Sequence, residues 1–147
     1  IVVDHLATPV GLFGAVGKKT GMTQSQRDAI FKQWQQDLAR LAEQKNVHAK
    51  ISGLMMPVLG HRFYQQDRTA SVSEMVSLLT PMIQHAIAVF GTERIMFASN
   101  FPMDKPNARL NDLIHAYIQM LSPYGDQALH TMFRQNAANF YQLQREL

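Results

Sequence analysis

Residues 94–104 read RIMFASNFPMD, and this stretch decides the fold. Its apolar run from Ile95 to Ala98 predicts a short buried strand, which the polar residues Ser99 and Asn100 end before Pro102. In barrels of parallel strands, catalytic groups stand where a strand gives way to a loop, and a carboxylate is the useful group there. This sequence has an amide, Asn100, at that point.

Two earlier segments show the same pattern of an apolar strand that ends in polar residues. The first, Ile1 to Val3, ends at Asp4 and His5. The second, VHAKIS at residues 47–52, ends at Ser52. Long loops follow both strands, and loops of this length at strand ends are more often functional than mere spacers.

Amphipathic segments lie between and after the three strands. Thr23 and Gln26 have the spacing of a capping box, which predicts the start of a helix. Thr80 before Pro81 predicts the start of a second helix, and Gly91 predicts its end. Two further helices are expected within residues 110–121 and 129–141. Short apolar strands that alternate with amphipathic helices predict an α/β fold with a parallel sheet.

The chain is too short for a closed barrel. It has 147 residues, of which 46% are hydrophobic and 17% charged, as expected for one globular unit. An eight-stranded barrel takes ~250 residues, and three strands do not close one. Because the sequence also starts in mid-strand without an initiator Met, residues 1–147 are predicted to be the C-terminal part of a single TIM (β/α)8-barrel domain.

Composition narrows the expected partners. The net charge of +3 is dispersed, which predicts no nucleic-acid partner. No uninterrupted apolar run approaches the ~20 residues of a membrane-spanning helix. The absence of cysteine excludes disulfides and thiolate metal sites and is compatible with a cytoplasmic location. We therefore expect a small-molecule substrate, no membrane, and association between copies through the open strand edges.

Several polar side chains are candidates for a site at the C-terminal rim of the sheet. Side chains alternate along a strand, so Lys50 and Ser52 share one face, while Asp4 and His5 point to opposite faces. In neighbouring parallel strands, Lys50 or Ser52 would meet His5 and Asn100. Arg62, in the second long loop, is a candidate clamp for a substrate carboxylate. A purely structural His5, hydrogen-bonded to the backbone, fits the spacing equally well.

Four segments carry a resemblance to a known family. IVVDHLATP, VHAKISGL, FGTERIMFASNFPMD and NAANFYQL resemble, in this order, the last strands and final helix of the amidohydrolase-related TIM barrels. That family includes sugar lactonases, pyrone-dicarboxylate lactonases and nonoxidative decarboxylases. The resemblance implies that His5 is a metal ligand or polarises the substrate, and that the paired histidines of the first strand lie upstream of Ile1.

The sequence departs from the family pattern at Asn100. The eighth strand of the family usually ends in Gly-Ser-Asp-aromatic-Pro, and this Asp is the metal ligand or the general base. An amide neither titrates near neutral pH nor binds metals well, which favours chemistry with a weakly bound divalent metal (zinc or similar) or with none. Asp104 is a candidate base if the loop through Pro102 folds back, and a solvated loop charge if it does not.

These observations predict a hydrolase that opens a lactone or a similar carbonyl ester of a small polar acid. His5 would polarise the carbonyl or bind the metal, and Asn100 would orient water or substrate. Two alternatives stay open: a nonoxidative decarboxylase on the same barrel, and a catalytically silent barrel that binds a small molecule. Residues 1–147 alone are expected to be inactive.

Overall fold

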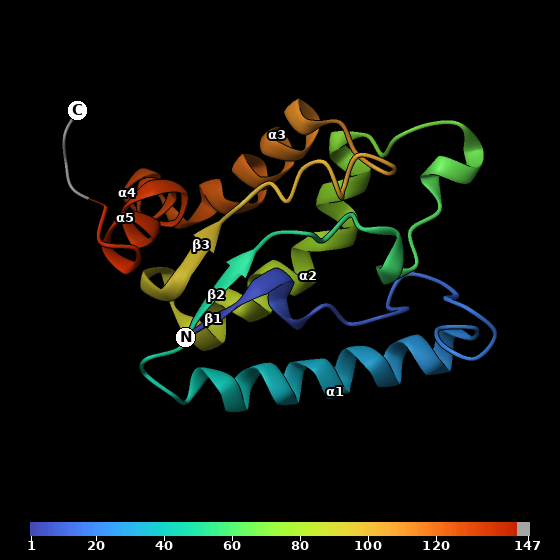
Figure 1. The fold of residues 1–147 in the computed structure, drawn as a ribbon, viewed down its shortest axis with the longest axis horizontal. Helices are drawn as coiled ribbons and strands as arrows, with labels where there is room; N and C mark the ends of the chain where they lie inside the picture. Colours follow the sequence, from blue (N-terminus) through green and yellow to red (C-terminus); the bar gives the residue numbers. More distant parts are fainter. Residues whose placement is uncertain (144–147) are drawn as a thin grey trace.

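The structure is a computed structural model, and it describes residues 1–143. Three strands form one sheet in the order β1 (Val2–Val3), β2 (His48–Ile51) and β3 (Ile95–Phe97). Both neighbouring pairs are parallel, with Val3 beside Ala49 and Ala49 beside Ile95. The carboxyl ends of the strands therefore meet at one rim, as the sequence predicted (Figure 1).

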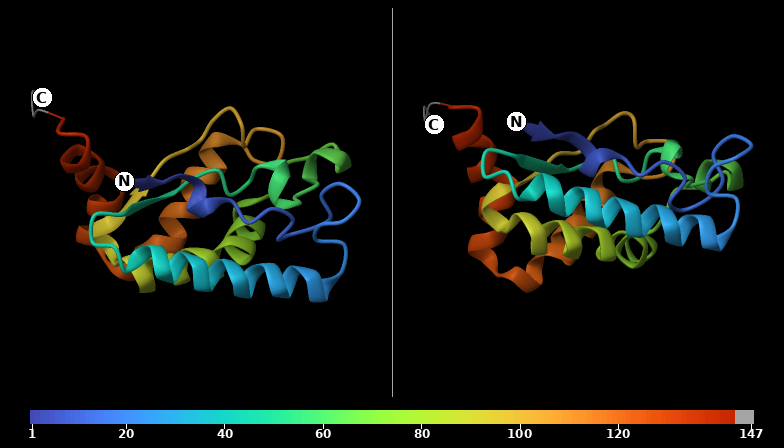
Figure 2. Two further views of the ribbon diagram at one scale, coloured as in Figure 1. Left: turned by 60° about the horizontal axis from the view of Figure 1, so that its bottom comes forward. Right: turned by 90° about the horizontal axis from the view of Figure 1, so that it is seen from below.

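Helices alternate with the strands, which confirms the expected α/β order. The long helices are α1 (Gln24–Ala42), α2 (Val72–Phe90) and α3 (Leu110–Leu121). The chain ends in α4 (Asp126–His130), a π-helical turn (Thr131–Gln135) and α5 (Asn136–Phe140). Figure 2 shows α1 and α2 side by side beneath the strands. Together these elements make part of a TIM barrel.

The start of α1 agrees with the prediction, and the start of α2 does not. Thr23 caps α1, and its capping box with Gln26 is present. Helix α2 begins at a second capping box, between Ser71 and Glu74, and runs through Pro81 without a break. The predicted start at Thr80 is therefore wrong, because burial of the apolar face on both sides of Pro81 outweighs the hydrogen bond that proline cannot donate.

Helix α2 is also long and apolar enough to cross a membrane, judged by length and composition alone. This was not expected from the sequence, because polar residues interrupt the apolar run. In the fold, α2 packs on α1, α3 and the sheet. Seven of its side chains are buried there, as in the central helix of a layered α/β unit: Met75, Leu79, Met82, Ile83, Ala86, Ile87 and Phe90.

The last strand is fixed between two layers of side chains. Phe97 lies edge-on to Tyr117 of α3 and stacks on Phe133, at centroid distances of 5.2 and 4.4 Å. Asn136, at the start of α5, donates hydrogen bonds of 2.7 Å to the carbonyls of Ile95 and Thr92. These contacts bind the final helix to β3 and so fix the direction in which β3 leads into the rim loop.

Candidate active site at the carboxyl ends of the strands

The loop after β1 begins with a strained turn. His5, Leu6, Ala7 and Thr8 all have positive φ, between 42° and 59°, although none is glycine. Left-handed backbone costs roughly 1–2 kcal/mol per residue of this kind. Burial of Leu6 and a 2.7 Å hydrogen bond from Trp34 Nε1 to the Leu6 carbonyl hold the turn in place. Such strain is typical of functional sites.

This turn brings His5 against the end of β2. His5 Nδ1 lies 2.8 Å from Ser52 Oγ, and Ser52 is buried. The ring packs directly over Gly53, where a Cβ atom would stand only 2.7 Å from His5 Nδ1. The sequence predicted that His5 meets Lys50 or Ser52 at the rim, but Gly53 was not among the predicted site residues. Its signal is a glycine directly after a strand, where close approach needs the absence of a side chain.

The expected alternation of Asp4 and His5 fails, because the strand ends at Val3 and the turn begins at once. Asp4 therefore does not point away from the other polar groups. Its carboxylate pairs with Lys50 Nζ at 3.1 Å. A hydrogen bond with Tyr141 and the contact with Asp4 raise the pKa of Lys50. Lys50 is thus a cation held by the protein, and its ammonium is already paired.

Asn100 also has a left-handed backbone, with φ of 54°, so the chain turns sharply after β3. The loop folds back and buries Asp104 completely, with Oδ1 accepting a 2.8 Å hydrogen bond from the amide of Met55. The interpretation of Asp104 as a solvated loop charge is therefore wrong. Asn107 strengthens the same junction, since its Nδ2 donates to the Met55 carbonyl at 2.8 Å.

Burial sets the charge state of Asp104. It raises the pKa of the carboxyl from 3.8 to about 6, against the opposing effects of the Met55 amide and of the Asn100 side chain. No well-aligned hydrogen bond joins the two side chains: Asn100 Nδ2 and Asp104 Oδ2 are both buried without a partner among the described residues. Burial and the nearby Asp104 also raise the pKa of Tyr117, whose hydroxyl is unpartnered too.

The two long loops form one layer over the rim. The amide of Phe13 donates to the Leu59 carbonyl at 2.8 Å, and the Phe13 ring stacks on His61 at 4.4 Å. His61 is buried and hydrogen-bonded to the Leu54 carbonyl, and burial lowers its pKa to about 4. Arg62 is exposed, and its guanidinium donates to the Ala15 carbonyl at 2.8 Å. In this arrangement Arg62 joins the two loops.

A divalent metal does not fit the described part of the chain by itself. Residues 1–143 hold no group of three or more His, Cys, Asp or Glu side chains that could bind a metal ion. Of the rim groups, only His5 is a good metal ligand with an accessible atom, because Asp104 is enclosed and Asn100 is a neutral amide. The described residues therefore do not make a metal site by themselves.

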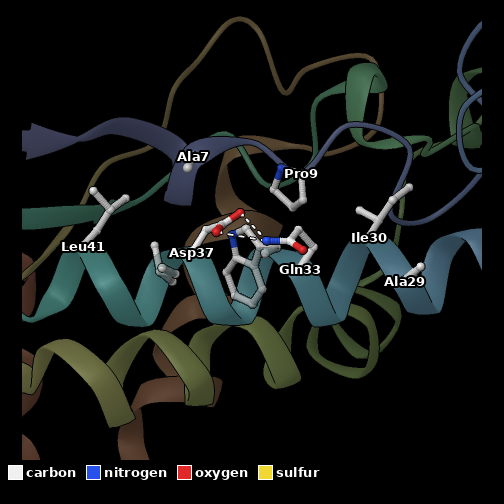
Figure 3. A pocket seen from close by; sticks show the side chains of 9 residues that line it. Ala7, Pro9, Ala29, Ile30, Gln33, Asp37 and Leu41 are labelled. Atoms are coloured by element: carbon white, nitrogen blue, oxygen red, sulfur yellow. Dashed lines mark hydrogen bonds between the residues drawn. The ribbon is translucent and has the colours of Figure 1, made fainter.

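A groove lies away from these residues. It measures about 550 Å³ and runs along α1 beside the edge strand β1 (Figure 3). Ala7 and Pro9 line it from the loop, and α1 contributes a mostly apolar wall with a Gln33–Asp37 hydrogen-bonded pair. None of the candidate site residues lines this groove.

The chain belongs to the amidohydrolase family. The family model described as "Amidohydrolase" matches residues 1–143. A curated relative, an uncharacterized protein of Sinorhizobium fredii, is 32% identical over 124 residues, which cover 84% of this chain and 37% of the relative. The family and the fold agree with the resemblance found in the sequence.

Solved structures support the same fold. An amidohydrolase from Burkholderia multivorans with bound HEPES matches with a TM-score of 0.76 at 20% identity, and a zinc-bound crystal form of it with 0.75 at 19%. A Pseudomonas putida protein named as a 2-pyrone-4,6-dicarboxylic acid hydrolase matches with a TM-score of 0.59 at 18% identity. The two Burkholderia multivorans structures each match 97% of this chain, and the Pseudomonas putida structure matches 99% of it. This chain, however, spans only 44% of the first two chains and 43% of the third.

Proposed function

We propose that the whole protein hydrolyses a lactone or a similar carbonyl ester of a small polar acid. The observation that carries the proposal is the placement of His5 and Asn100 at one rim of a parallel sheet in a chain of the amidohydrolase family. The name of the Pseudomonas putida neighbour adds a lactone-type substrate to this argument. Neighbouring parallel strands lie ~4.8 Å apart, and β2 lies between β1 and β3. The space between the His5 and Asn100 side chains is therefore about the size of a small molecule.

The proposed reaction is attack of water on the carbonyl carbon. A new C–O bond forms as the ring C–O bond breaks, and the leaving alkoxide takes up a proton. His5 polarises the carbonyl, and Asn100 orients the water. Asp104 is the titratable group beside Asn100, and its pKa of about 6 suits a base near neutral pH. Because that carboxylate is enclosed, a group from the rest of the barrel is the alternative base.

Substrate contacts complete the proposal. Of the expected substrate contacts, Arg62 stands at the loop layer, whereas the Lys50 ammonium reaches a substrate only by leaving Asp4, and the buried Ser52 acts through His5. We place the protein in the cytoplasm and expect it to act on a small molecule, without a nucleic-acid or membrane partner. Residues 1–147 alone are proposed to be inactive, because the chain spans less than half of the neighbouring barrels.

The test is an assay of the intact protein on lactones and, in parallel, on aromatic carboxylic acids. We expect lactone hydrolysis, and His5→Ala should lower kcat/KM by roughly 10²–10⁴-fold. His115→Ala, at an exposed site on α3, is the matched control and should keep full activity. Carbon dioxide release from the acids without lactone hydrolysis would favour a decarboxylase and would overturn the proposal.

A catalytically silent barrel is the second candidate, and Asn100 is the observation that favours it. Such a protein would bind a small polar acid but turn over neither substrate class. Binding measured by calorimetry, with no hydrolysis by the intact protein, would identify it.

A further inference from the structure

The surroundings of Ser52 and His5 determine which of the two side chains donates the hydrogen bond between them. Ser52 is only 1% exposed, and its Oγ has one hydrogen-bond partner among the described residues, His5 Nδ1 at 2.8 Å. A buried hydroxyl group needs an acceptor for its proton. If Nδ1 carried a proton, it would donate to Ser52 Oγ, and the Ser52 hydroxyl would be left without an acceptor.

We infer that Ser52 donates to His5 Nδ1 and thereby fixes the neutral His5 ring with its proton on Nε2. The inference rests on the proposed function, in which a carbonyl compound lies at this rim. Nε2 has no partner among the described residues and is not one of the enclosed polar atoms, so it is open to a ligand. His5 then presents an N–H donor to the carbonyl oxygen. Ser52 is a positioning residue, because it acts through His5.

The opposite side of the site has the complementary polarity. Asn100 Nδ2 is buried near Asp104, whose carboxylate accepts hydrogen bonds and, when ionised, donates none. The amide therefore turns its N–H₂ group toward Asp104 and leaves Oδ1 for the ligand. A donor at His5 and an acceptor at Asn100 match a carbonyl oxygen on one side and a water or hydroxyl proton on the other.

A proton on His5 Nε2 is incompatible with zinc binding at that nitrogen, although one related structure has zinc bound. A metal at Nε2 needs the lone pair of that nitrogen, so the ring proton would have to move to Nδ1. The proton of the buried Ser52 hydroxyl would then lose its acceptor. The described residues thus favour His5 as a hydrogen-bond donor over His5 as a metal ligand.

The test is a nitrogen NMR spectrum of the intact, metal-free protein labelled with ¹⁵N-histidine, at a pH where the rings are neutral. The His5 signals are assigned from their loss in His5→Gln. We expect the Nε2–H tautomer with a hydrogen-bonded Nδ1. In Ser52→Ala, the Nδ1 signal should move toward the value of a free imidazole, and kcat/KM should fall ~10–100-fold, as when an orienting partner is lost.

Two results would overturn the inference: an Nδ1–H tautomer in the wild-type protein, or conversion of His5 to a metal-bound ring by one equivalent of zinc. Ser52→Thr, which keeps the hydroxyl group, should retain the wild-type Nδ1 signal if the larger side chain is accommodated. The spectrum is recorded on the resting protein, so it does not depend on turnover. An inactive protein with an Nε2–H ring would refute the proposed function and leave this inference standing.

Discussion

The carboxylate of Asp104 accepts a 2.8 Å hydrogen bond from the backbone amide of Met55, and so the loop after β3 is tied to the loop after β2. The bond is buried, and Asn107 doubles the connection through the Met55 carbonyl. Because Asn100 lies within the same folded-back loop, the position of its amide depends on this junction. The rim therefore behaves as one connected layer.

Replacement of Asp104 by Asn should stabilise the protein above pH 6. The folded-state pKa is about 6 against an ordinary 3.8, so the folded protein binds more protons between these values, and stability is lost as pH rises through them. Asn keeps an acceptor for Met55 without the charge. We expect Asp104→Asn to raise the unfolding free energy by ~1–3 kcal/mol at pH 7.5 and by little near pH 4, in urea titrations.

His61 also makes stability depend on pH, in the opposite direction to Asp104. Comparing the unfolding free energy of the variant with that of the wild type at each pH cancels this effect. Burial lowers the pKa of His61 to about 4. The contribution of His61 to the stability of the fold is therefore lost as pH falls from about 6.5 toward 4, and this happens in both proteins. Asp126→Asn, at an exposed position on α4, is the control and should change stability little at either pH. Destabilisation by Asp104→Asn at pH 7.5 but not near pH 4 would contradict this expectation and would show that the fold requires the anion.

A side chain at Gly53 should displace His5. Gly53 has φ of 64°, and a Cβ atom there would lie 2.7 Å from His5 Nδ1. Gly17 has nearly the same φ, 63°, with no atom within 4 Å of its Cβ position. Both alanine variants should lose ~1–2 kcal/mol for the left-handed backbone. Gly53→Ala should lose a further ~1–3 kcal/mol for the clash.

Activity separates the two glycine variants more sharply than stability does. Gly53→Ala should lower kcat/KM and shift the His5 ring signals, since the contact with Ser52 is broken. Gly17→Ala should change neither. If the two variants had the same activity, the close packing of His5 on Gly53 would be unimportant for the site.

Conversion of Asn100 to Asp should raise the affinity of the intact protein for divalent metals. The change is nearly isosteric and adds the carboxylate that the family pattern has at this strand end. It also places a second carboxylate near Asp104, so the two would share a proton and part of the gain would be hidden near neutral pH. The double variant Asn100→Asp with Asp104→Asn removes that competition and should bind zinc more tightly than either single variant.

Calorimetric zinc titrations measure this effect. Asn111→Asp, which adds the same charge at an exposed position of α3, is the control for non-specific attraction. Zinc affinity that is unchanged in both the single and the double variant would count against Asn100 as the ligand position.

A polypeptide limited to residues 1–147 should associate with itself. Among the described residues the sheet has only three strands, so β1 and β3 are edges whose free N–H and C=O groups can pair with another chain. The apolar groove along α1 adds surface beside the β1 edge (Figure 3). Sedimentation velocity should show dimers or larger species. A monomer with a cooperative melt would instead identify residues 1–147 as an independent domain.

The sequence alone determined the order and type of the elements. Strands as short as Ile95–Phe97 are apolar throughout because both faces are buried, and amphipathic helices with local caps lie between them. Parallel pairing then follows from the length of the crossovers, and it brings His5 and Asn100 to one rim. These conclusions depend on interactions within one element or between consecutive elements.

Only the tertiary structure decided how the rim groups are paired and where their protons lie. Pro81 is inside α2 because packing on both sides of it outweighs a local signal. Asp4 reaches Lys50, and His5 reaches Ser52, because four residues adopt left-handed backbone that Leu6 burial and Trp34 stabilise. Asp104 is buried because Met55, 49 residues earlier, donates to it. Contacts between residues so distant along the chain leave no periodic signal in the sequence, and burial alone moves the pKa of Asp104 toward neutrality.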